Sequence, residues 1–311
     1  MSTTELALTS LYMPLDTSAR AMGELRSSTD LANDPEALRE RMREEGYLFL
    51  RGYLDADEVL AARAEITRRL ADHGFLDADY PAIEAVSKPP ATSPSFVAMT
   101  ETLTANNRPL TKLLYSGRMM ALYERLLGGA VRHYDFTWLR AVSGGGRGVH
   151  PHCDVVYMGR GTTNLFTAWT PLGDVPFDLG GLMILEGSHR KAAKLRNYLE
   201  RDVDAYCTNR PDAPEIESGA KTWQNWDGRL SSDPTTLREK LGGRWLTTEF
   251  RAGDVLTFGM ATVHASMDNQ TNRFRLSSDS RYQLASDPID DRWIGDKPVG
   301  HGAAGKRGKI C

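Results

Sequence analysis

Two histidines, one aspartate and one arginine form the most informative set of polar residues in this sequence. His152 and Asp154 stand one residue apart, and His264 and Arg275 follow far downstream. Two imidazoles and one carboxylate can occupy one face of an octahedral Fe(II) ion, which leaves three positions open for O2 and substrates. Arg275 could hold the far carboxylate of a 2-oxoacid through a planar, two-pronged hydrogen bond. The set therefore predicts a non-haem iron site with an anchor for an acidic co-substrate.

The spacing of the first pair is typical of a strand. Residues i and i+2 of a strand face the same side, so His152 and Asp154 can reach one metal while Cys153 points away. His150 has the same parity and is either a rival ligand or a partner that orients the site. A His-x-Asp pair alone is a weak signal, since most such residues are surface or core features. Because ligation needs neutral imidazole and ionised carboxylate, we expect activity to fall at acid pH.

The two downstream residues each end or begin an apolar run. The residues from Gly253 to His264 predict a turn and then an apolar strand that ends in a histidine, although a buried core histidine is the alternative. The stretch from Phe274 to Tyr282 also reads as a strand.

That last strand would carry a charged face. Arg275, Ser277, Asp279 and Arg281 alternate along it and would share one side. Charged side chains that face inward are costly unless they are paired or bind a ligand. A 2-oxoglutarate carboxylate held by Arg275 and Ser277 would satisfy this face. The alternative is a solvent-exposed face with an Asp279–Arg281 ion pair, which would contribute little to stability.

Composition excludes several classes of partner. The 311 residues include 38 Lys+Arg and 41 Asp+Glu, a net charge of −3, which gives no electrostatic case for nucleic acid or an anionic membrane. No stretch is long and apolar enough to span a membrane, and the N-terminus lacks the features of a secretory signal. The cysteines Cys153, Cys207 and Cys311 form no CxxC pair. We therefore expect no disulfide and a cytoplasmic protein.

The first part of the chain predicts an arm and then helices. Residues 1–32 are polar and predict an N-terminal arm that is either extended or loosely ordered. A helix is expected from near Asp34 to Glu45, a strand over 46–52, and a helix capped by Asp55 or Asp57 that ends at Gly74. Residues 76–106 read mainly as loop. One further amphipathic helix, with leucines from 110 to 126, is expected to end at Gly128-Gly129.

From Val131 onward, short apolar runs are separated by glycine and proline, which is typical of a sandwich or jelly roll. Expected strands lie within 131–142, 164–170, 181–185, 245–250, 254–260 and 274–284. Residues 191–241 interrupt them as a lid-like insertion, in which Trp223 and Trp226 could close over a substrate or only anchor the segment. The chain thus predicts one domain over 33–290 and a C-terminal tail over 291–311, whose glycines favour a flexible end from Gly300 to Cys311.

Several stretches, in order, resemble one family of enzymes. They are Gly46–Leu54, Leu126–Gly129, His152–Asp154, Trp169–Asp174, Gly180–Arg190, His264–Ser266 and Arg275–Ser277. Together they resemble the phytanoyl-CoA dioxygenase family of Fe(II)/2-oxoglutarate oxygenases. The Gly180–Arg190 stretch is the most specific of them.

The resemblance implies a mainly β fold with flanking helices, a double-stranded β-helix (a cupin-like jelly roll) braced by N-terminal helices. It implies iron bound by His152, Asp154 and His264, and 2-oxoglutarate that chelates the iron. The residues that match the co-substrate site are Arg275, Ser266 and Trp169. The long insertion and the basic tail depart from the family pattern, which affects the substrate more than the chemistry.

The expected reaction is hydroxylation of an unactivated C–H bond of a small molecule, with O2 as oxidant and succinate and CO2 as products. Desaturation, cyclisation or demethylation by the same chemistry is an alternative, as are a protein or peptide substrate and a metal-binding jelly roll without oxygenase activity. Because Asp154 is present, halogenation is disfavoured. Arg140 and Tyr157 flank the metal motif and could meet a polar substrate group, or could be ordinary surface residues. Substrate identity and oligomeric state do not follow from the sequence.

Overall fold

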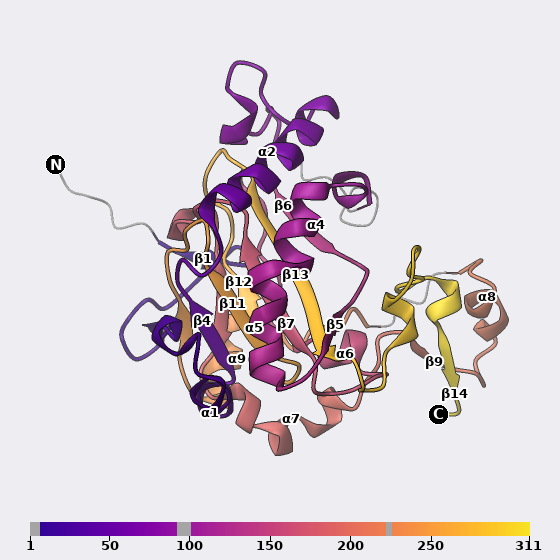
Figure 1. Ribbon diagram of the computed structural model, residues 1–311. Coiled ribbons are helices and arrows are strands. Elements are labelled where there is room, and N and C mark those ends of the chain that lie inside the picture. The colour runs from indigo at the N-terminus through magenta and orange to yellow at the C-terminus, as the bar shows by residue number, and fades with distance from the viewer. Residues whose placement is uncertain (1–6, 92–100, 222–225) are drawn as a thin grey trace.

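Two β-sheets packed face to face form the centre of the molecule (Figure 1). The computed structural model describes residues 7–91, 101–221 and 226–311. The larger sheet has the order β4-β11-β7-β13-β5, with β6 also paired to β13, and the smaller has the order β12-β8-β10-β3. The larger sheet consists of β4 (Tyr47–Leu50), β11 (Val255–Gly259), β7 (Phe166–Pro171), β13 (Arg275–Leu284), β5 (Val131–His133) and β6 (Trp138–Val142). The smaller consists of β12 (His264–Ser266), β8 (Leu182–Leu185), β10 (Trp245–Thr247) and β3 (Met22–Glu24).

The larger sheet is buried on both faces, which explains why its strands read as continuous apolar runs. In β4, Tyr47 and Phe49 point into the core between the sheets, whereas Leu48 and Leu50 point to the opposite face. That inner core also contains Ile184 of the smaller sheet. Such a pair of facing sheets with helices on one outer face is the predicted double-stranded β-helix, and the fold prediction is confirmed.

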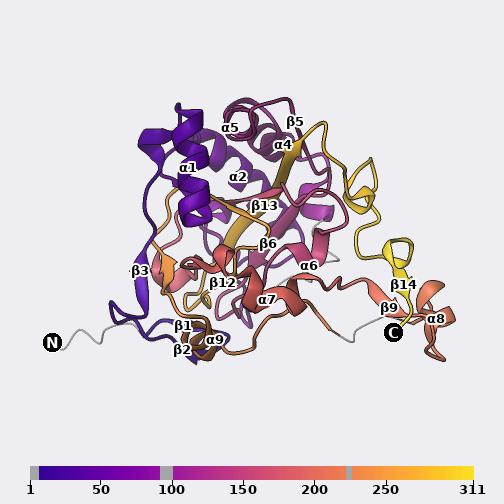
Figure 2. The ribbon, with the colours of Figure 1, turned by 90° about the horizontal axis from the view of Figure 1, so that it is seen from below.

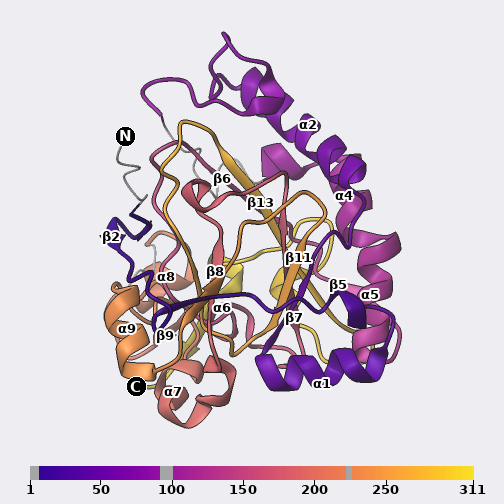
Figure 3. The same ribbon diagram turned by 90° about the vertical axis from the view of Figure 1, so that its left-hand side faces the viewer.

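Helices cover the outer face of the larger sheet (Figure 3). They are α1 (Pro35–Glu45), α2 (Ala56–Asp72), α4 (Arg108–Tyr115) and α5 (Gly117–Leu127). Asp34 and Asp55 cap α1 and α2, because each carboxylate accepts two backbone N–H groups of the first turn. Helix α2 buries Val59, Ala62, Ile66 and Leu70, which recur at helical spacing on one face.

The single helix predicted over residues 110–126 is wrong, because the chain forms α4 and α5 with a break at Ser116. Ser116 is extended (φ −148°, ψ 179°), and Gly117 has a φ of 53°. Glycine adopts that left-handed conformation without steric cost, so the chain can turn there. The leucine spacing continues through the break and therefore gave no sign of it.

Within the described residues, the N-terminal arm forms short strands that contact the rest of the chain. Strands β1 (Thr9–Ser10) and β2 (Met13–Pro14) form a hairpin, and β3 pairs in parallel with β10. Both residues of the hairpin turn, Leu11 and Tyr12, have positive φ, and their N–H groups donate to the buried carboxylate of Asp268. A distant side chain thus stabilises an unusual turn. The predicted domain boundaries at 33 and 290 stay predictions.

The insertion contains α7 (Ala192–Leu199), β9 (Ala205–Cys207), α8 (Ala213–Glu217) and α9 (Pro234–Leu241). Part of the insertion, β9 and α8, lies beside the tail at one end of the molecule, whereas α9 lies near β1 and β2 (Figure 2). Strand β9 pairs in parallel with β14 (Arg307–Lys309) of the tail, and Cys207 and Cys311 form a disulfide. The predictions of a flexible tail and of no disulfide are therefore wrong.

A buried carboxylate strengthens this connection. Asp204 accepts hydrogen bonds from the side chains of Arg292, His301 and Lys306, all from the C-terminal part of the chain. Burial raises the pKa of Asp204, but His301 and Lys306 outweigh burial and hold that pKa at about 2.

No helix in the described ranges is long and apolar enough to cross a membrane.

Removing the disulfide should destabilise the protein. The two cysteines are 104 residues apart in sequence, so the cross-link restricts a long loop of the unfolded chain. We expect the double variant Cys207→Ser/Cys311→Ser to lose about 2–4 kcal/mol of unfolding free energy, measured by urea denaturation. Wild-type protein in a thiol reductant is the matched control and should behave as the variant does. Alkylation of all three cysteines in unreduced, unfolded wild-type protein would contradict the disulfide.

Candidate active site

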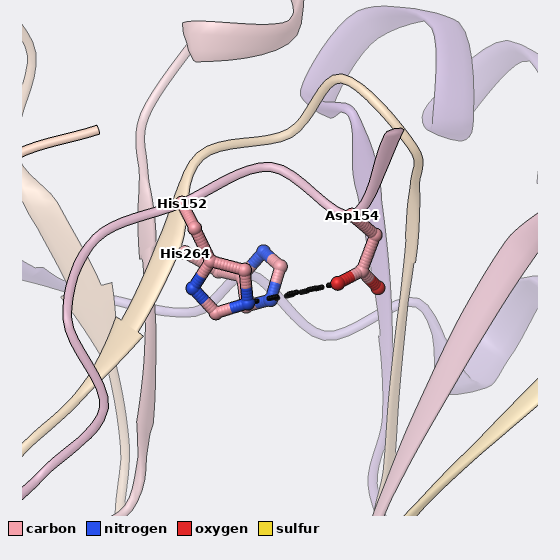
Figure 4. A group of neighbouring side chains, drawn as sticks. All are labelled: His152, Asp154 and His264. Carbon is pink, nitrogen blue, oxygen red and sulfur yellow. Dashed lines mark ion pairs between the residues drawn. The ribbon is translucent and has the colours of Figure 1, made fainter. Parts of the chain in front are cut away.

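His152, Asp154 and His264 converge at one point between the sheets (Figure 4). Their potential ligand atoms all lie within 4.8 Å of one another. The Nε2 atoms of both histidines are 3.6 Å from Asp154 Oδ1. All three side chains are buried. Residues 112 positions apart in sequence thus present two nitrogens and one oxygen to a common centre, which is the donor set of the Fe(II) facial triad.

Backbone pairing places the two histidines side by side. His152 and His264 exchange both N–H···O bonds at 3.0 Å, which extends the smaller sheet beyond β12. Asp154 is not on a strand as predicted: it has helical dihedral angles and immediately precedes the short helix α6 (Val155–Met158). The turn directs its carboxylate toward the larger sheet. Cys153 is buried among apolar residues and is not part of the ligand group, as expected.

Each histidine is held in the tautomer that a metal needs. The Nδ1 of His152 lies 2.8 Å from the carbonyl oxygen of His150, and the Nδ1 of His264 lies 3.0 Å from that of Thr262. A carbonyl oxygen only accepts, so both Nδ1 atoms carry the proton and both Nε2 lone pairs face the centre. Of the two roles expected for His150, the orienting role is the one its backbone carbonyl performs.

The second oxygen of Asp154 is bound by the larger sheet. Its Oδ2 accepts hydrogen bonds from Thr167 Oγ1 at 2.5 Å and from Arg281 Nη2 at 3.0 Å. The alternative of an Asp279–Arg281 ion pair is therefore wrong, and Asp279 pairs instead with Arg140 at 2.9 Å. Sequence reasoning missed Arg281 and Thr167 as site residues. The shared parity of Arg281 with Arg275 on β13 was the available signal.

The protonation states of the three convergent residues suit a bound cation. Burial raises the pKa of Asp154, but Arg281, His264 and His152 outweigh it and hold that pKa well below its usual range. Burial, with a further contribution from His152, lowers the pKa of His264 to about 3. At neutral pH His264 is therefore uncharged and Asp154 is ionised. The positive charge beside the Asp154 carboxylate at neutral pH is that of the Arg281 guanidinium.

The inner face of β13 continues from the metal centre to a buried cation. Arg275 is buried, and burial together with Arg140 lowers its pKa to about 10, so it stays charged at neutral pH. Within the described ranges, Arg275 Nη2 and Ser277 Oγ have no hydrogen-bond partner. Unpaired buried donors are expensive unless a ligand binds them.

One pocket is lined by Arg275 and by the three convergent residues. Ser266 and Trp169 also line it, as the resemblance implied. Ser266 Oγ accepts a hydrogen bond from the N–H of Val149, and Trp169 packs edge-on against Phe250. The pocket therefore has a cationic hydrogen-bond donor, Arg275, at one end and the three potential metal ligands at the other. This arrangement suits a small dicarboxylic acid.

The predicted substrate residues lie in different places. Arg140 lines the pocket. The Tyr157 hydroxyl donates to the carbonyl of Asp227, and the Tyr157 ring packs against His152. Trp226 donates to a carbonyl of its own segment and lies under the guanidinium of Arg201, so it anchors the insertion. Trp223 lies outside the described residues.

Comparison with known proteins identifies the family. The family model Phytanoyl-CoA dioxygenase (PhyH) matches residues 42–277. The chain belongs to the phytanoyl-CoA dioxygenase family. This confirms the predicted resemblance and the predicted class, an oxidoreductase. Among its relatives are the 1-deoxypentalenic acid 11-beta-hydroxylases of Streptomyces exfoliatus and Streptomyces arenae, each 26% identical over 267 residues that cover 83% of this chain and 84% of the relative.

Several solved structures have a similar fold. EctD from S. alaskensis, bound to 2-oxoglutarate and 5-hydroxyectoine, has a TM-score of 0.56 at 19% identity and covers 96% of this chain and 99% of its own. The epimerase SnoN, in complex with Fe3+, alpha ketoglutarate and nogalamycin RO, has a TM-score of 0.53 at 22% identity and covers 86% of this chain and 94% of its own. At these identities the likeness shows the shared fold.

The neutral histidines should make the metal-free protein sensitive to acid. An unfolded histidine has a pKa near 6.5, whereas burial lowers the pKa of His264 to about 3 and that of His150 to about 4. Below pH 6.5 the unfolded chain therefore binds protons that the folded chain does not, and stability is lost. We expect urea midpoints, measured with a chelator present, to be lower at pH 5 than at pH 7.

The variant His264→Asn tests the source of that dependence. Asparagine does not titrate, so the difference between the two pH values should shrink, while His73→Asn on the surface should leave it unchanged. An undiminished difference in His264→Asn would contradict the assignment.

Proposed function

We propose that this chain is an Fe(II)- and 2-oxoglutarate-dependent dioxygenase that hydroxylates an unactivated C–H bond of a small molecule and releases succinate and CO2. The cofactors are Fe(II) and 2-oxoglutarate, with O2 as oxidant. The observation that carries the proposal is the buried guanidinium of Arg275, with a donor unpaired in the described structure, across one pocket from the His152–Asp154–His264 donor set. The names of the relatives, a hydroxylase among them, support the same reaction class.

Each residue has a distinct task in this proposal. His152 Nε2, His264 Nε2 and Asp154 Oδ1 bind the iron, while the Nδ1 bonds to carbonyl groups fix both rings. Iron bound there supplies the activation of O2, coupled to oxidative decarboxylation of 2-oxoglutarate. Arg275 and Ser277 bind the distal carboxylate, so the opposite end of the co-substrate points to the metal.

Ser266 and Trp169 form pocket wall between these two ends. Trp169 is fully buried and excludes water from the co-substrate, which strengthens the charged hydrogen bonds of Arg275. Because Asp154 is retained, the position that a halide would need is filled. Hydroxylation is therefore favoured over halogenation. Desaturation, cyclisation or demethylation would use the same residues with a different substrate pose.

The pocket favours a substrate with an anionic or polar group. Three arginines and two aspartates line it, a balance of +1: Arg140, Arg275, Arg281, Asp154 and Asp279. A ferrous ion and a 2-oxoglutarate dianion cancel, so the balance stays positive once both are bound. Arg140 is the predicted substrate residue that lies on the pocket, and we propose that it meets this group. Tyr157 and Trp226 are engaged elsewhere and are better explained as supports. A relative named for its action on 1-deoxypentalenic acid is consistent with an acidic small molecule.

A cytoplasmic location stays a prediction. The argument from reduced cysteines no longer supports it, because Cys207 and Cys311 are bonded.

Succinate release tests the function against its alternatives. Protein supplied with Fe(II), ascorbate and 2-oxoglutarate should release succinate slowly even without substrate, and a metal-binding jelly roll without oxygenase activity should release none. A screen of small acids and of peptides for compounds that accelerate this release then separates the two substrate classes.

Replacing Arg275 should weaken co-substrate binding. Arg275→Met removes a charge-assisted, two-pronged interaction worth about 1.5–3 kcal/mol, so the Kd for 2-oxoglutarate should rise about 10- to 100-fold. Titration of Mn(II)-loaded protein with 2-oxoglutarate measures this. Arg275→Lys, which keeps the charge without the fork, should fall in between, and Mn(II) affinity should not change. Unchanged 2-oxoglutarate affinity in Arg275→Met would refute the anchor.

Replacing Asp154 should remove the metal site. Asp154→Ala takes away the charged ligand and leaves two neutral imidazoles, so Mn(II) binding and succinate release should both be lost. Asp135→Ala, at an exposed aspartate away from the pocket, is the matched control. Full metal binding by Asp154→Ala would show that the ligand set is wrong.

A further inference from the structure

The two oxygens of Asp154 have entirely different surroundings. Oδ1 faces both imidazoles at 3.6 Å, whereas Oδ2 accepts two hydrogen bonds from the larger sheet. A carboxylate oxygen has two lone-pair sites. The Thr167 hydroxyl and the Arg281 guanidinium occupy both sites of Oδ2, so only Oδ1 has lone pairs left for a metal.

Strand register makes this arrangement rigid. Thr167 on β7 and Arg281 on β13 are direct cross-strand partners at the centre of the larger sheet. Both are buried, and the guanidinium of Arg281 also lies 4.4 Å above the ring of Trp138. The histidines belong to the smaller sheet, so Asp154 is the ligand whose orientation the larger sheet sets.

The number of ligand atoms from Asp154 decides how many positions stay open. With one oxygen bound, the protein fills three of six octahedral positions. Chelation by 2-oxoglutarate then leaves one position for O2. With both oxygens bound, the protein would fill four and the co-substrate two, and no position would remain.

We propose that Thr167 and Arg281 are positioning residues that restrict Asp154 to one-oxygen ligation and so keep the O2 position open. This inference rests on the proposed function. An alternative is that Arg281 only neutralises the charge of Asp154. That role would not require the uncharged hydroxyl of Thr167, whereas the proposed role does. Thr167 is therefore the residue that separates the two explanations.

The test counts exchangeable water molecules on bound Mn(II). Water-proton relaxation by a protein-bound Mn(II) ion increases with the number of waters in its coordination sphere, so it reports open positions without turnover. Thr167→Val preserves shape and removes the hydrogen bond, which frees Oδ2 to bind the ion. We expect relaxation of the Mn(II) complex to fall by about one third, as three waters become two. After saturation with 2-oxoglutarate, wild type should keep one water and Thr167→Val none.

Three further variants complete the design. Thr167→Ser keeps the hydroxyl and should restore the wild-type value. Thr257→Val is the matched control, since Thr257 is a buried threonine on the neighbouring strand β11 whose hydroxyl bonds to Tyr123 instead. It should leave the water count unchanged. Arg281→Gln, checked for folding by circular dichroism, should lower the water count in the same way as Thr167→Val.

Each other outcome has a defined meaning. Equal relaxation in Thr167→Val and wild type overturns the proposal, and so does loss of Mn(II) binding by that variant, because the hydroxyl would then hold the ligand in place without setting its denticity. Absence of Mn(II) binding by wild type, or no loss of water on adding 2-oxoglutarate, would instead overturn the proposed function.

Discussion

The antiparallel pairing of β7 with β13 is the interaction on which the site depends. This pairing runs from Ser277↔Pro171 to Tyr282↔Phe166 and directs Ser277, Asp279 and Arg281 to one side of β13, and Arg275, paired with Val142 of β6, continues that side. Charged groups there are expensive to bury unless each has a partner. Arg281 pairs with Asp154 and Asp279 pairs with Arg140. Among the described residues, Arg275 Nη2 and the Nε and Nη1 of Arg281 have no hydrogen-bond partner. The buried charges of the site are thus only partly paired within the described protein.

The other sheet contributes the complementary half. The His152–His264 backbone exchange ties two distant segments into one edge, and carbonyl oxygens fix both rings. Metal donors come from the smaller sheet and its turn, and the groups that bind acids come from the larger sheet. The pocket exists where the two meet, so its shape depends on how the sheets pack as much as on the residues that line it.

Much of this could be predicted from the sequence because it is local. Asp34 and Asp55 stand directly before apolar helical patterns, and alternation along residues 275–281 assigns those side chains to one face. The metal set followed from residue types and order. What failed was non-local or hidden by periodicity: the break at Ser116–Gly117 lies within an uninterrupted leucine spacing, and the bond between Cys207 and Cys311 joins positions 104 residues apart. The pairing of Arg281 with Asp154 needs the three-dimensional arrangement, since Asp279 is nearer in sequence.

Asp268 connects the N-terminal arm, which lies outside the family match, with the segment that precedes His152. Its carboxylate accepts N–H groups from Leu11 and Tyr12 of the arm and from Gly148, four residues before the first metal histidine. The arm lies outside the family match, which begins at residue 42. Ser10 also donates to the carbonyl of Ser266, a pocket residue. Sequence changes in the N-terminal arm could therefore alter the shape of the pocket wall between two relatives whose metal and co-substrate residues are identical.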